Sequence, residues 1–367
     1  MRRTAIALAA STAAVSLAAC GVIDGSGGGG SATPKKGDDI TVGLLLPEKE
    51  NPRYESFDYP DIQKQVLSLT HGKGKVDYAN AEQDAAKQSQ QLDQMIADKV
   101  DVLLVDPVDS KAIAPGVQKA KDAGIPVIAY DRLAQGPIDA YISFDNELVG
   151  EVQGRSLAEK LNNPSGTSKI VMMNGSPTDP NAAQFKAGAL SELSGKANIV
   201  RKYDTKDWKP ANAKANMLDA IKAVGANSIS GVYAANDGMA GAVIEALKES
   251  GVTQLPPVTG QDASLEAVQR IVSGEQYMSV YKPYPTEATN AAEMAVAKVQ
   301  GRDIEFDALT RDKVDSPTQK DIAAMLVPVV ELTRKNIKDT VLQDGIYTVK
   351  DICTPKYQAA CAAIKLG

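Results

Sequence analysis

Short apolar runs alternate with helical patterns along most of this chain, and this alternation restricts its fold more than any other feature. Strands are predicted at 40–46, 76–80, 101–107, 125–131, 141–144, 168–175, 197–204, 229–237, 256–263 and 277–285, with helices between them, for example at 81–100, 110–124, 147–161 and 210–224. Such alternation is typical of parallel sheets with helices on both faces. So many strands would strain a single sheet, and 367 residues suffice for two domains. The sequence therefore predicts an α/β fold with two doubly wound parallel-sheet lobes.

The N-terminal segment has the pattern of an export signal followed by a linker. Arg2 and Arg3 precede an apolar stretch of small residues, 5–19, which is too short to span a membrane as a mature helix. The stretch ends in Leu-Ala-Ala-Cys, the pattern of a bacterial lipobox. It predicts a signal peptide at 1–19, cleavage before Cys20 and lipidation of the Cys20 thiol, with an ordinary cleaved signal peptide as the alternative. Gly and Ser dominate residues 20–39, which is typical of a flexible tether.

Two more cysteines, Cys353 and Cys361, lie near the C-terminus. Disulfides persist in exported proteins, and Pro355 between the two cysteines favours a turn that would bring them together. We predict a disulfide within a C-terminal extension, 351–367, and two free buried thiols are the alternative.

Polar side chains stand at the carboxyl ends of the predicted strands. They are Asp131 and Arg132, Asp145 and Asn146, the segment 175–182, Asn236 and Asp237, Gln261 and Asp262, and Lys282. In open parallel sheets, ligands bind at this edge. Taken singly, residues such as Asp179 before Pro180 are also good helix caps. The full set favours a ligand site, because Arg and Lys do not cap the starts of helices.

The residue types also exclude several kinds of site. The one histidine, His71, lies in a predicted polar turn, and the sequence has neither a Cys/His cluster for a metal nor a phosphate-binding glycine motif after a strand. We therefore expect no catalytic residue, metal or cofactor, and the net charge of −6 argues against a nucleic-acid partner. The mixture of Asp, Asn, Arg and Lys suits a sugar, whose hydroxyls both donate and accept hydrogen bonds. Tyr54 and Trp208 follow strands and could stack on its apolar face.

Six separated stretches resemble, in the same order, the xylose-binding branch of periplasmic sugar-binding proteins, the type I solute receptors of ABC importers. They are YDRLAQGPIDAYISFDNELVGEVQ, NGSPTDPNAAQFKAG, AANDGMAGAVIEAL, TGQDASLEAVQRI, YMSVYKP and KNIKDTVLQDG. The resemblance runs from about residue 40 to 347. It implies an N-terminal lobe from 40–145 and 283–320, a C-terminal lobe from 146–282 and 321–350, and a hinge of crossing strands near 145, 282 and 320.

The resemblance further implies which side chains contact the sugar. They are Arg53, Tyr54, Asp131, Arg132, Asp179, Asn181, Trp208, Asn236, Asp262 and Lys282. Two positions depart from the family pattern. Tyr54 stands where the family commonly has Trp, and Lys186 stands where xylose receptors commonly have Arg. Because Lys offers a point charge and Arg a planar fork, we include Lys186 in the site as a residue that selects between sugars.

The function implied by the resemblance is that of a receptor without chemistry. It would be a monomer outside the cytoplasm, held to the membrane by its lipid alone. It would bind D-xylose, with glucose as a second candidate, and deliver it to an ABC importer permease by lobe closure. A sugar receptor for a membrane signalling system and a secreted sugar-modifying enzyme are the alternatives. A sugar-responsive repressor is excluded, because the signal sequence and tether occupy the place of its DNA-binding domain.

Overall fold

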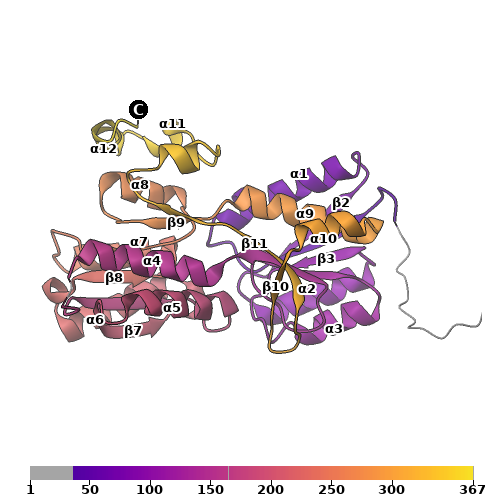
Figure 1. Cartoon of the computed structure of the whole chain (residues 1–367), viewed down its shortest axis with the longest axis horizontal. Helices are drawn as coiled ribbons and strands as arrows, with labels where there is room; N and C mark the ends of the chain where they lie inside the picture. The colour runs from indigo at the N-terminus through magenta and orange to yellow at the C-terminus, as the bar shows by residue number, and fades with distance from the viewer. Residues whose placement is uncertain (1–35, 164, 367) are drawn as a thin grey trace, which may run out of the picture. The chain divides into compact units, whose positions relative to one another are not determined.

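The structure is a computed structural model that describes residues 36–163 and 165–366. The predicted signal peptide, Cys20 and most of the tether lie outside these residues. Within the described chain, strands and helices alternate as two lobes, each built on a parallel sheet (Figure 1). The fold class predicted from the sequence is thereby confirmed. Among the helices of the described residues, none is long and apolar enough to cross a membrane.

The first lobe is built on a seven-stranded sheet. Its strands are β1 (Thr41–Leu46), β2 (Lys75–Asn80), β3 (Val102–Val105), β4 (Val127–Tyr130), β5 (Ala140–Phe144), β10 (Asp312–Val314) and β11 (Ile322–Val327). They lie in the order β10-β11-β5-β4-β3-β1-β2, with β10 antiparallel to β11 and the other neighbours parallel. The carboxyl ends of the parallel strands therefore meet at one edge of the sheet.

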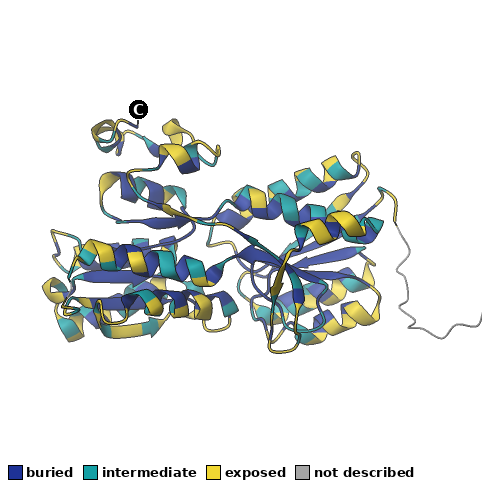
Figure 2. Cartoon of the chain, viewed as in Figure 1, coloured by how far each residue is buried: buried dark blue, intermediate teal, exposed yellow. Residues whose placement is uncertain are grey.

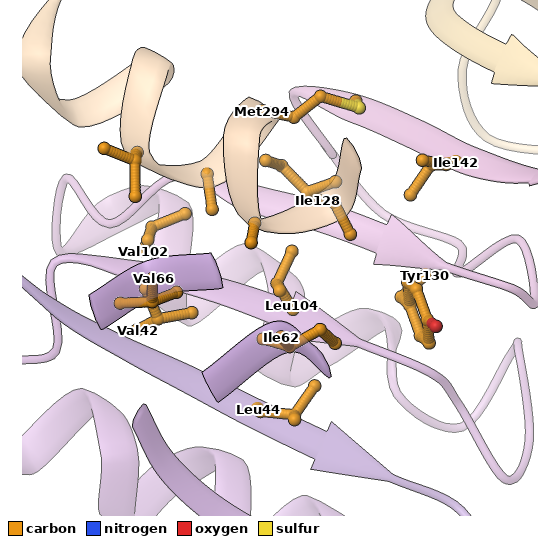
Figure 3. Close-up of a cluster of buried hydrophobic side chains, with 14 of the residues drawn as sticks. Val42, Leu44, Ile62, Val66, Val102, Leu104, Ile128, Tyr130, Ile142 and Met294 are labelled. Carbon is orange, nitrogen blue, oxygen red and sulfur yellow. The ribbon is translucent and has the colours of Figure 1, made fainter. Parts of the chain in front are cut away.

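Helices cover both faces of this sheet because its central strands β1, β3, β4 and β5 are apolar on both sides, and Figure 2 draws these strands as buried. One face carries η1 (Tyr54–Asp58), α1 (Tyr59–Leu69), α9 (Tyr284–Gln300) and α10 (Asp303–Leu309), and the other carries α2 (Ala85–Ala97) and α3 (Ala114–Asp122). Leu44 packs in one cluster with Ile62 and Met294, which Figure 3 shows, whereas its neighbour Leu45 packs with Leu92 of α2. Successive residues of a strand thus anchor opposite helical layers.

The second lobe has a smaller parallel sheet with the same layering. Its strands β6 (Lys169–Asn174), β7 (Asn198–Asp204) and β8 (Gly231–Ala234) lie in the order β7-β6-β8, and a bridge from Val232 to Val258 extends it. One face carries α4 (Asn146–Leu161) and α5 (Pro180–Leu193), and the other carries α6 (Pro210–Val224) and α7 (Asp237–Glu249). A Cβ at Gly188 would lie 2.0 Å from the carbonyl oxygen of Glu147, so the close approach of α5 to α4 requires glycine there.

The remaining elements complete the second lobe. They are η2 (Lys206–Trp208), η3 (Ala226–Ser228), α8 (Leu265–Ser273), β9 (Ser279–Tyr281), β12 (Val330–Leu332), η4 (Lys338–Leu342), α11 (Val349–Ile352) and α12 (Gln358–Ala363). Strands β9 and β12 form an antiparallel pair. Ile352 and Cys361 pack in one cluster with Ile271 of α8, and the sulfurs of Cys353 and Cys361 are bonded at 2.09 Å. The C-terminal extension is thus closed on itself and packs on α8.

The chain crosses between the lobes three times. It leaves the first lobe after Phe144 of β5, returns after Tyr281 of β9, and leaves again after Val327 of β11. The third crossing differs from the predicted position near residue 320. Residues 322–327 pair with β5 in the first sheet, because this apolar segment completes the edge of that sheet, and only β12 joins the second lobe.

Candidate ligand-binding site

A pocket between the lobes brings together ten of the eleven side chains that the sequence placed in a site. Its lining consists of Arg53, Tyr54, Asp131, Arg132, Asp179, Asn181, Trp208, Asn236, Asp262 and Lys282, with four further residues, Glu48, Asn51, Phe185 and Gln261. They come from both lobes and follow the carboxyl ends of strands or begin helices. The topology of two parallel sheets therefore assembles one polar pocket from widely separated segments.

Arg53 is a lining residue that the first lobe contributes to the pocket. Its Nε lies 2.8 Å from Asp58, its Nη1 3.2 Å from Asp131 and its Nη2 2.7 Å from Glu287. The ring of Tyr284 lies 4.3 Å from the guanidinium carbon. All of these groups are buried. One cation thus holds three carboxyl groups, which is an unusually acidic arrangement for a buried cluster.

Burial and charge act differently on these carboxyl groups. Burial raises the pKa of Asp58 and Glu287 above the ordinary values, although Arg53 opposes the shift. Burial also raises the pKa of Asp131, but the positive charges of Arg53, Lys282 and Arg132 outweigh it and leave the pKa below its ordinary value. Asp131, which lines the pocket, is therefore the member of the cluster whose ionised form is favoured by its surroundings.

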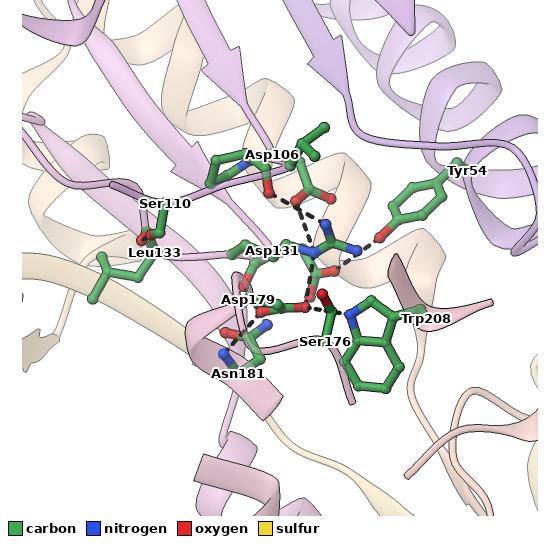
Figure 4. Close-up of polar contacts among 12 residues, drawn as sticks. Tyr54, Asp106, Ser110, Asp131, Leu133, Ser176, Asp179, Asn181 and Trp208 are labelled. Atoms are coloured by element: carbon green, nitrogen blue, oxygen red, sulfur yellow. Dashed lines mark hydrogen bonds and ion pairs between the residues drawn. The ribbon is translucent and has the colours of Figure 1, made fainter. Parts of the chain in front are cut away.

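Arg132 joins the two lobes. Its Nε lies 3.0 Å from Asp179 of the second lobe and 3.5 Å from Asp106 of the first, and its Nη1 donates to the carbonyl of Pro107 at 3.2 Å. Figure 4 labels Asp106 and Asp179, the two carboxyl groups that Arg132 contacts. Burial raises the pKa of Asp106 well above its ordinary range. Arg132 is the cation through which the two walls meet.

Trp208 forms part of the wall contributed by the second lobe. Its Nε1 donates to Asp179 at 3.0 Å, and its ring meets that of Phe185 edge to face at 6.3 Å between centroids. A Cβ at Gly175 would lie 2.0 Å from the indole ring, so the glycine after β6 makes room for it. Trp208 and the preceding Asp207 have φ values of +57°. The turn, the glycine and the hydrogen bond together fix the indole at the pocket.

Lys282 and Asp262 form the third charged contact. Their Nζ and Oδ1 atoms lie 3.2 Å apart, and the amide of Asn51, from the first lobe, donates to Asp262 Oδ2 at 2.9 Å. Asn236 caps α7, since its Oδ1 accepts from the amide of Met239 at 2.9 Å. The two interpretations of the strand-end residues, cap and pocket lining, therefore both hold at this position.

Lys186 is the one predicted site residue that the structure does not bring to the pocket. Its side chain is 35% exposed, and its Nζ lies 3.3 Å from Asp204 on the outer surface. Asn181 and Phe185 of the same helix line the pocket, since residues four apart share a helix face. Lys186 follows Phe185 by about 100° around the helix. The structure therefore places Phe185, and not Lys186, in the lining of this pocket, and the role of Lys186 in selecting between sugars stays a prediction.

The comparisons with known proteins agree with this architecture. A family model described as a periplasmic binding protein domain matches residues 42–303. The chain belongs to this family. It is 35% identical over 320 residues to the D-xylose-binding periplasmic protein of Escherichia coli K12, which covers 86% of this chain and 93% of that protein. It is 36% identical to the protein of the same name from Haemophilus influenzae, with 86% and 92% covered.

Solved structures of solute-binding proteins share the fold. An ABC transporter solute-binding protein from Clostridium phytofermentans with bound β-D-glucose has a TM-score of 0.79 and 28% identity, covering 85% of this chain and 99% of its own. A carbohydrate transporter solute-binding protein from Chloroflexus aurantiacus in complex with D-glucose has a TM-score of 0.73 and 28% identity, covering 85% and 98%. These relatives are substrate-binding proteins rather than enzymes, and the fold is that of a type I periplasmic binding protein.

Proposed function

We propose that this chain is an extracytoplasmic receptor for a free aldopyranose, D-xylose first and glucose second, which it holds between its lobes without chemical change. The observation that carries the proposal is the polar pocket to which both lobes contribute charged side chains. A pyranose presents hydroxyls around an apolar ring, so it needs carboxylates, cations and an aromatic surface at close quarters. Asp131, Lys282 and Trp208 offer these three at one pocket.

Lobe closure follows from how the two walls meet. Several contacts across the cleft are polar: Asn51 with Asp262, Arg132 with Asp179, and the Asn181 amide with the carbonyl of Asp131 at 3.0 Å. Polar contacts of this kind exchange readily for the hydroxyls of a sugar, whereas a packed apolar interface would not. We therefore propose a hinge motion about the three crossings, which encloses the sugar and presents both lobes to an importer permease.

Calorimetric titration of the purified protein with xylose, glucose and ribose tests the binding. We expect xylose to bind near the micromolar range, about −8 kcal/mol. Asp262→Ala should weaken binding more than tenfold, because it leaves buried polar groups without partners. Asp93→Ala, on the outer face of the first lobe, is the matched control and should bind as the parent does. No response to any of these sugars would contradict the proposal, and an altered sugar after long incubation would favour the enzyme.

Membrane anchoring and delivery are separate parts of the proposal. Cys20 lies outside the described residues, and its role is proposed from the lipobox pattern alone. In the native host, Cys20→Ala should move the protein from the membrane fraction to the soluble fraction, and unchanged fractionation would rule out the anchor. Uptake of labelled xylose with and without the chain separates an importer receptor from a signalling receptor, since a purely signalling receptor leaves uptake unchanged.

A further inference from the structure

A second cavity adjoins the pocket between the lobes. The two share the lining residues Glu48, Asn51, Trp208, Asn236 and Asp262, and the outer cavity has a volume of about 350 Å³. Its further lining is acidic, with Glu50, Asp207, Asp237 and Glu266 against a single cation, Arg270. The guanidinium of Arg270 already donates to the Asp237 carbonyl at 2.8 Å and to Gln276 at 3.0 Å. The outer cavity therefore has a surplus of negative charge.

The buried ionisable groups of the described residues are unbalanced in the same direction, with more acids than bases. Eight carboxyl groups are buried against three cations: Glu48, Asp58, Asp106, Asp131, Asp179, Asp237, Asp262 and Glu287 against Arg53, Arg132 and Lys282. Every one of these acids except Glu48 and Asp237 lies within 4.0 Å of a cation among the described residues. Asp237 is instead satisfied by hydroxyl and amide donors at 2.8–3.0 Å.

Glu48 is the other of the two acids without a cation. Within the described residues, no Lys or Arg lies within ion-pair distance of it, and its carboxylate accepts a hydrogen bond from the backbone amide of Asn51 at 2.9 Å. It is 4% exposed and lines both cavities. Burial raises the pKa of Glu48 to about 7, although the backbone hydrogen bond from Asn51 and the positive charge of Arg132 oppose the shift. A cation beside Glu48 would relieve this cost.

The hydrogen-bonding capacity of the pocket is unbalanced too. Three buried lining atoms lack a hydrogen-bond partner among the described residues, and all are oxygens: Asp131 Oδ1, Asn181 Oδ1 and Gln261 Oε1. The donors of Arg53, by contrast, are shared among three carboxyl groups. A hydroxyl brings one donor and two acceptor sites, whereas an ammonium group brings three donors and no acceptor. The pocket is therefore short of the groups that an ammonium supplies.

We propose that the site takes an aminated sugar, whose protonated amine lies against Glu48 where the two cavities meet. This inference rests on the proposed function, because it names a further class of monosaccharide that the same pocket takes. Glu48 is then a specificity-determining residue. The outer cavity gives the amine room beside the other carboxylates that line it.

Parallel titrations at neutral pH test the proposal with defined probes. They are D-glucose, D-glucosamine, the isomers of glucosamine with the amine at carbon three or carbon six, and N-acetyl-D-glucosamine, whose nitrogen is a neutral amide. At least one amine should bind about tenfold more tightly than glucose, because a charge-assisted hydrogen bond replaces a neutral one. N-acetyl-D-glucosamine should not gain. If glucose or xylose binds and no amine binds more tightly than glucose, this inference is overturned and the proposed function stands.

The ratio of the amine and glucose affinities, measured in one protein, isolates the role of Glu48. Glu48→Gln keeps the shape and removes the charge, so the ratio should fall to about one. Glu305→Gln makes the same change on the exposed side of α10 and should keep the parent ratio. A parent-like ratio in Glu48→Gln would overturn the assignment. If an amine binds while neither glucose nor xylose does, the inference holds and the neutral ligand of the proposed function fails.

Proton release gives a readout that does not depend on the variant folding well. At pH 6 the carboxyl of Glu48 is largely protonated, since its pKa is about 7, and an arriving ammonium should displace that proton. Titrations in two buffers of different ionisation enthalpy should therefore show release of up to one proton for the amine and fewer for glucose. Equal proton release for both ligands would contradict the contact with Glu48.

Discussion

Arg53 and Arg132 are both buried guanidinium groups at the same pocket, yet they serve different parts of the molecule. The three carboxyl partners of Arg53, which are Asp58, Asp131 and Glu287, all belong to the first lobe. Arg132 has Asp106 in its own lobe and Asp179 in the other. The first is a structural centre within one lobe, and the second connects the two lobes.

The difference shows that two arginines can both be buried and both line the pocket and still have different roles. A cation whose donors are all held by its own lobe contributes to the stability of that lobe before any ligand arrives. A contact that reaches across the cleft, such as that of Arg132 with Asp179, contributes only when the lobes are together. Changing each arginine to methionine should therefore affect different measured quantities: the free energy of unfolding for Arg53, and sugar affinity and closure for Arg132.

The largest effect is expected at Arg53. Arg53→Met leaves three carboxyl groups without their cation, and removing one partner of a buried ion pair costs about 3–5 kcal/mol. The free energy of unfolding should fall by that amount in a urea titration without sugar. Arg155→Met removes an exposed contact with Glu192 and is the control, with an expected loss below about 1 kcal/mol. Equal losses in the two variants would show that Arg53 is not a structural centre.

Asp237 provides a contrast to the carboxyl groups beside Arg53 and Arg132. Its buried carboxyl group accepts hydrogen bonds from neutral donors and has no ion pair among the described residues. Burial raises its pKa from 3.8 to about 7. Between these values the folded protein keeps a proton that the unfolded chain releases, so stability falls as pH rises through this window and levels off above it. The contribution is on the order of 3–4 kcal/mol. Asp237→Asn should flatten the decline in unfolding free energy between pH 4 and pH 7.

The exposed Asp93 provides the control for this pH profile. Asp93→Asn should leave the slope as it is in the parent, because the Asp93 side chain is 49% exposed beside Lys119. A slope in Asp237→Asn that equals the parent slope would show that the other buried carboxyl groups, and not Asp237, carry the pH dependence.

At Arg132 the expected effect is on binding and closure. Arg132→Met removes the contact with Asp179 across the cleft, and the loss of a hydrogen bond to a charged group corresponds to about 1.5–3 kcal/mol of sugar affinity, roughly tenfold or more. X-ray scattering at saturating sugar should also give a larger radius of gyration than the parent has. A variant that binds weakly but closes to the parent radius would separate Arg132 from closure and assign it to the sugar alone.

The sequence predicts the residues at the strand ends better than it predicts the carboxyl partners of Arg53. Asp131, Arg132 and Lys282 are predicted because parallel strands place their carboxyl ends along one edge, so a position in the sequence pattern becomes a position in space. Asp58 and Glu287 are not predicted. They lie inside helical segments, 54–69 and 284–300, whose packing around Arg53 depends on contacts between residues up to 234 positions apart.

The sequence patterns also miss these helices themselves. Pro60 stands near the start of α1, and Pro283 precedes α9, so both helices begin with residues that a strand or a turn could equally contain. Similarly, β11 is a short apolar segment whose lobe is decided by pairing with β5 and not by its own composition. Element type follows from local pattern, whereas the choice of partner follows from tertiary contacts.

The smallest effect is expected at Lys186, the predicted residue that lies outside the pocket. Lys186→Arg should change the ratio of xylose and glucose affinities by less than a factor of two, because its Nζ lies with Asp204 at the surface and such pairs contribute about 0–1 kcal/mol. Phe185→Leu is the matched change on the same helix. Its ring meets Trp208 edge to face, so it should weaken the binding of both sugars by about 0.5–1.5 kcal/mol. Parallel titrations of the two variants compare adjacent residues, one in the pocket lining and one outside it. A shifted ratio in Lys186→Arg with parent-like binding in Phe185→Leu would favour the original assignment of Lys186 to the choice between sugars.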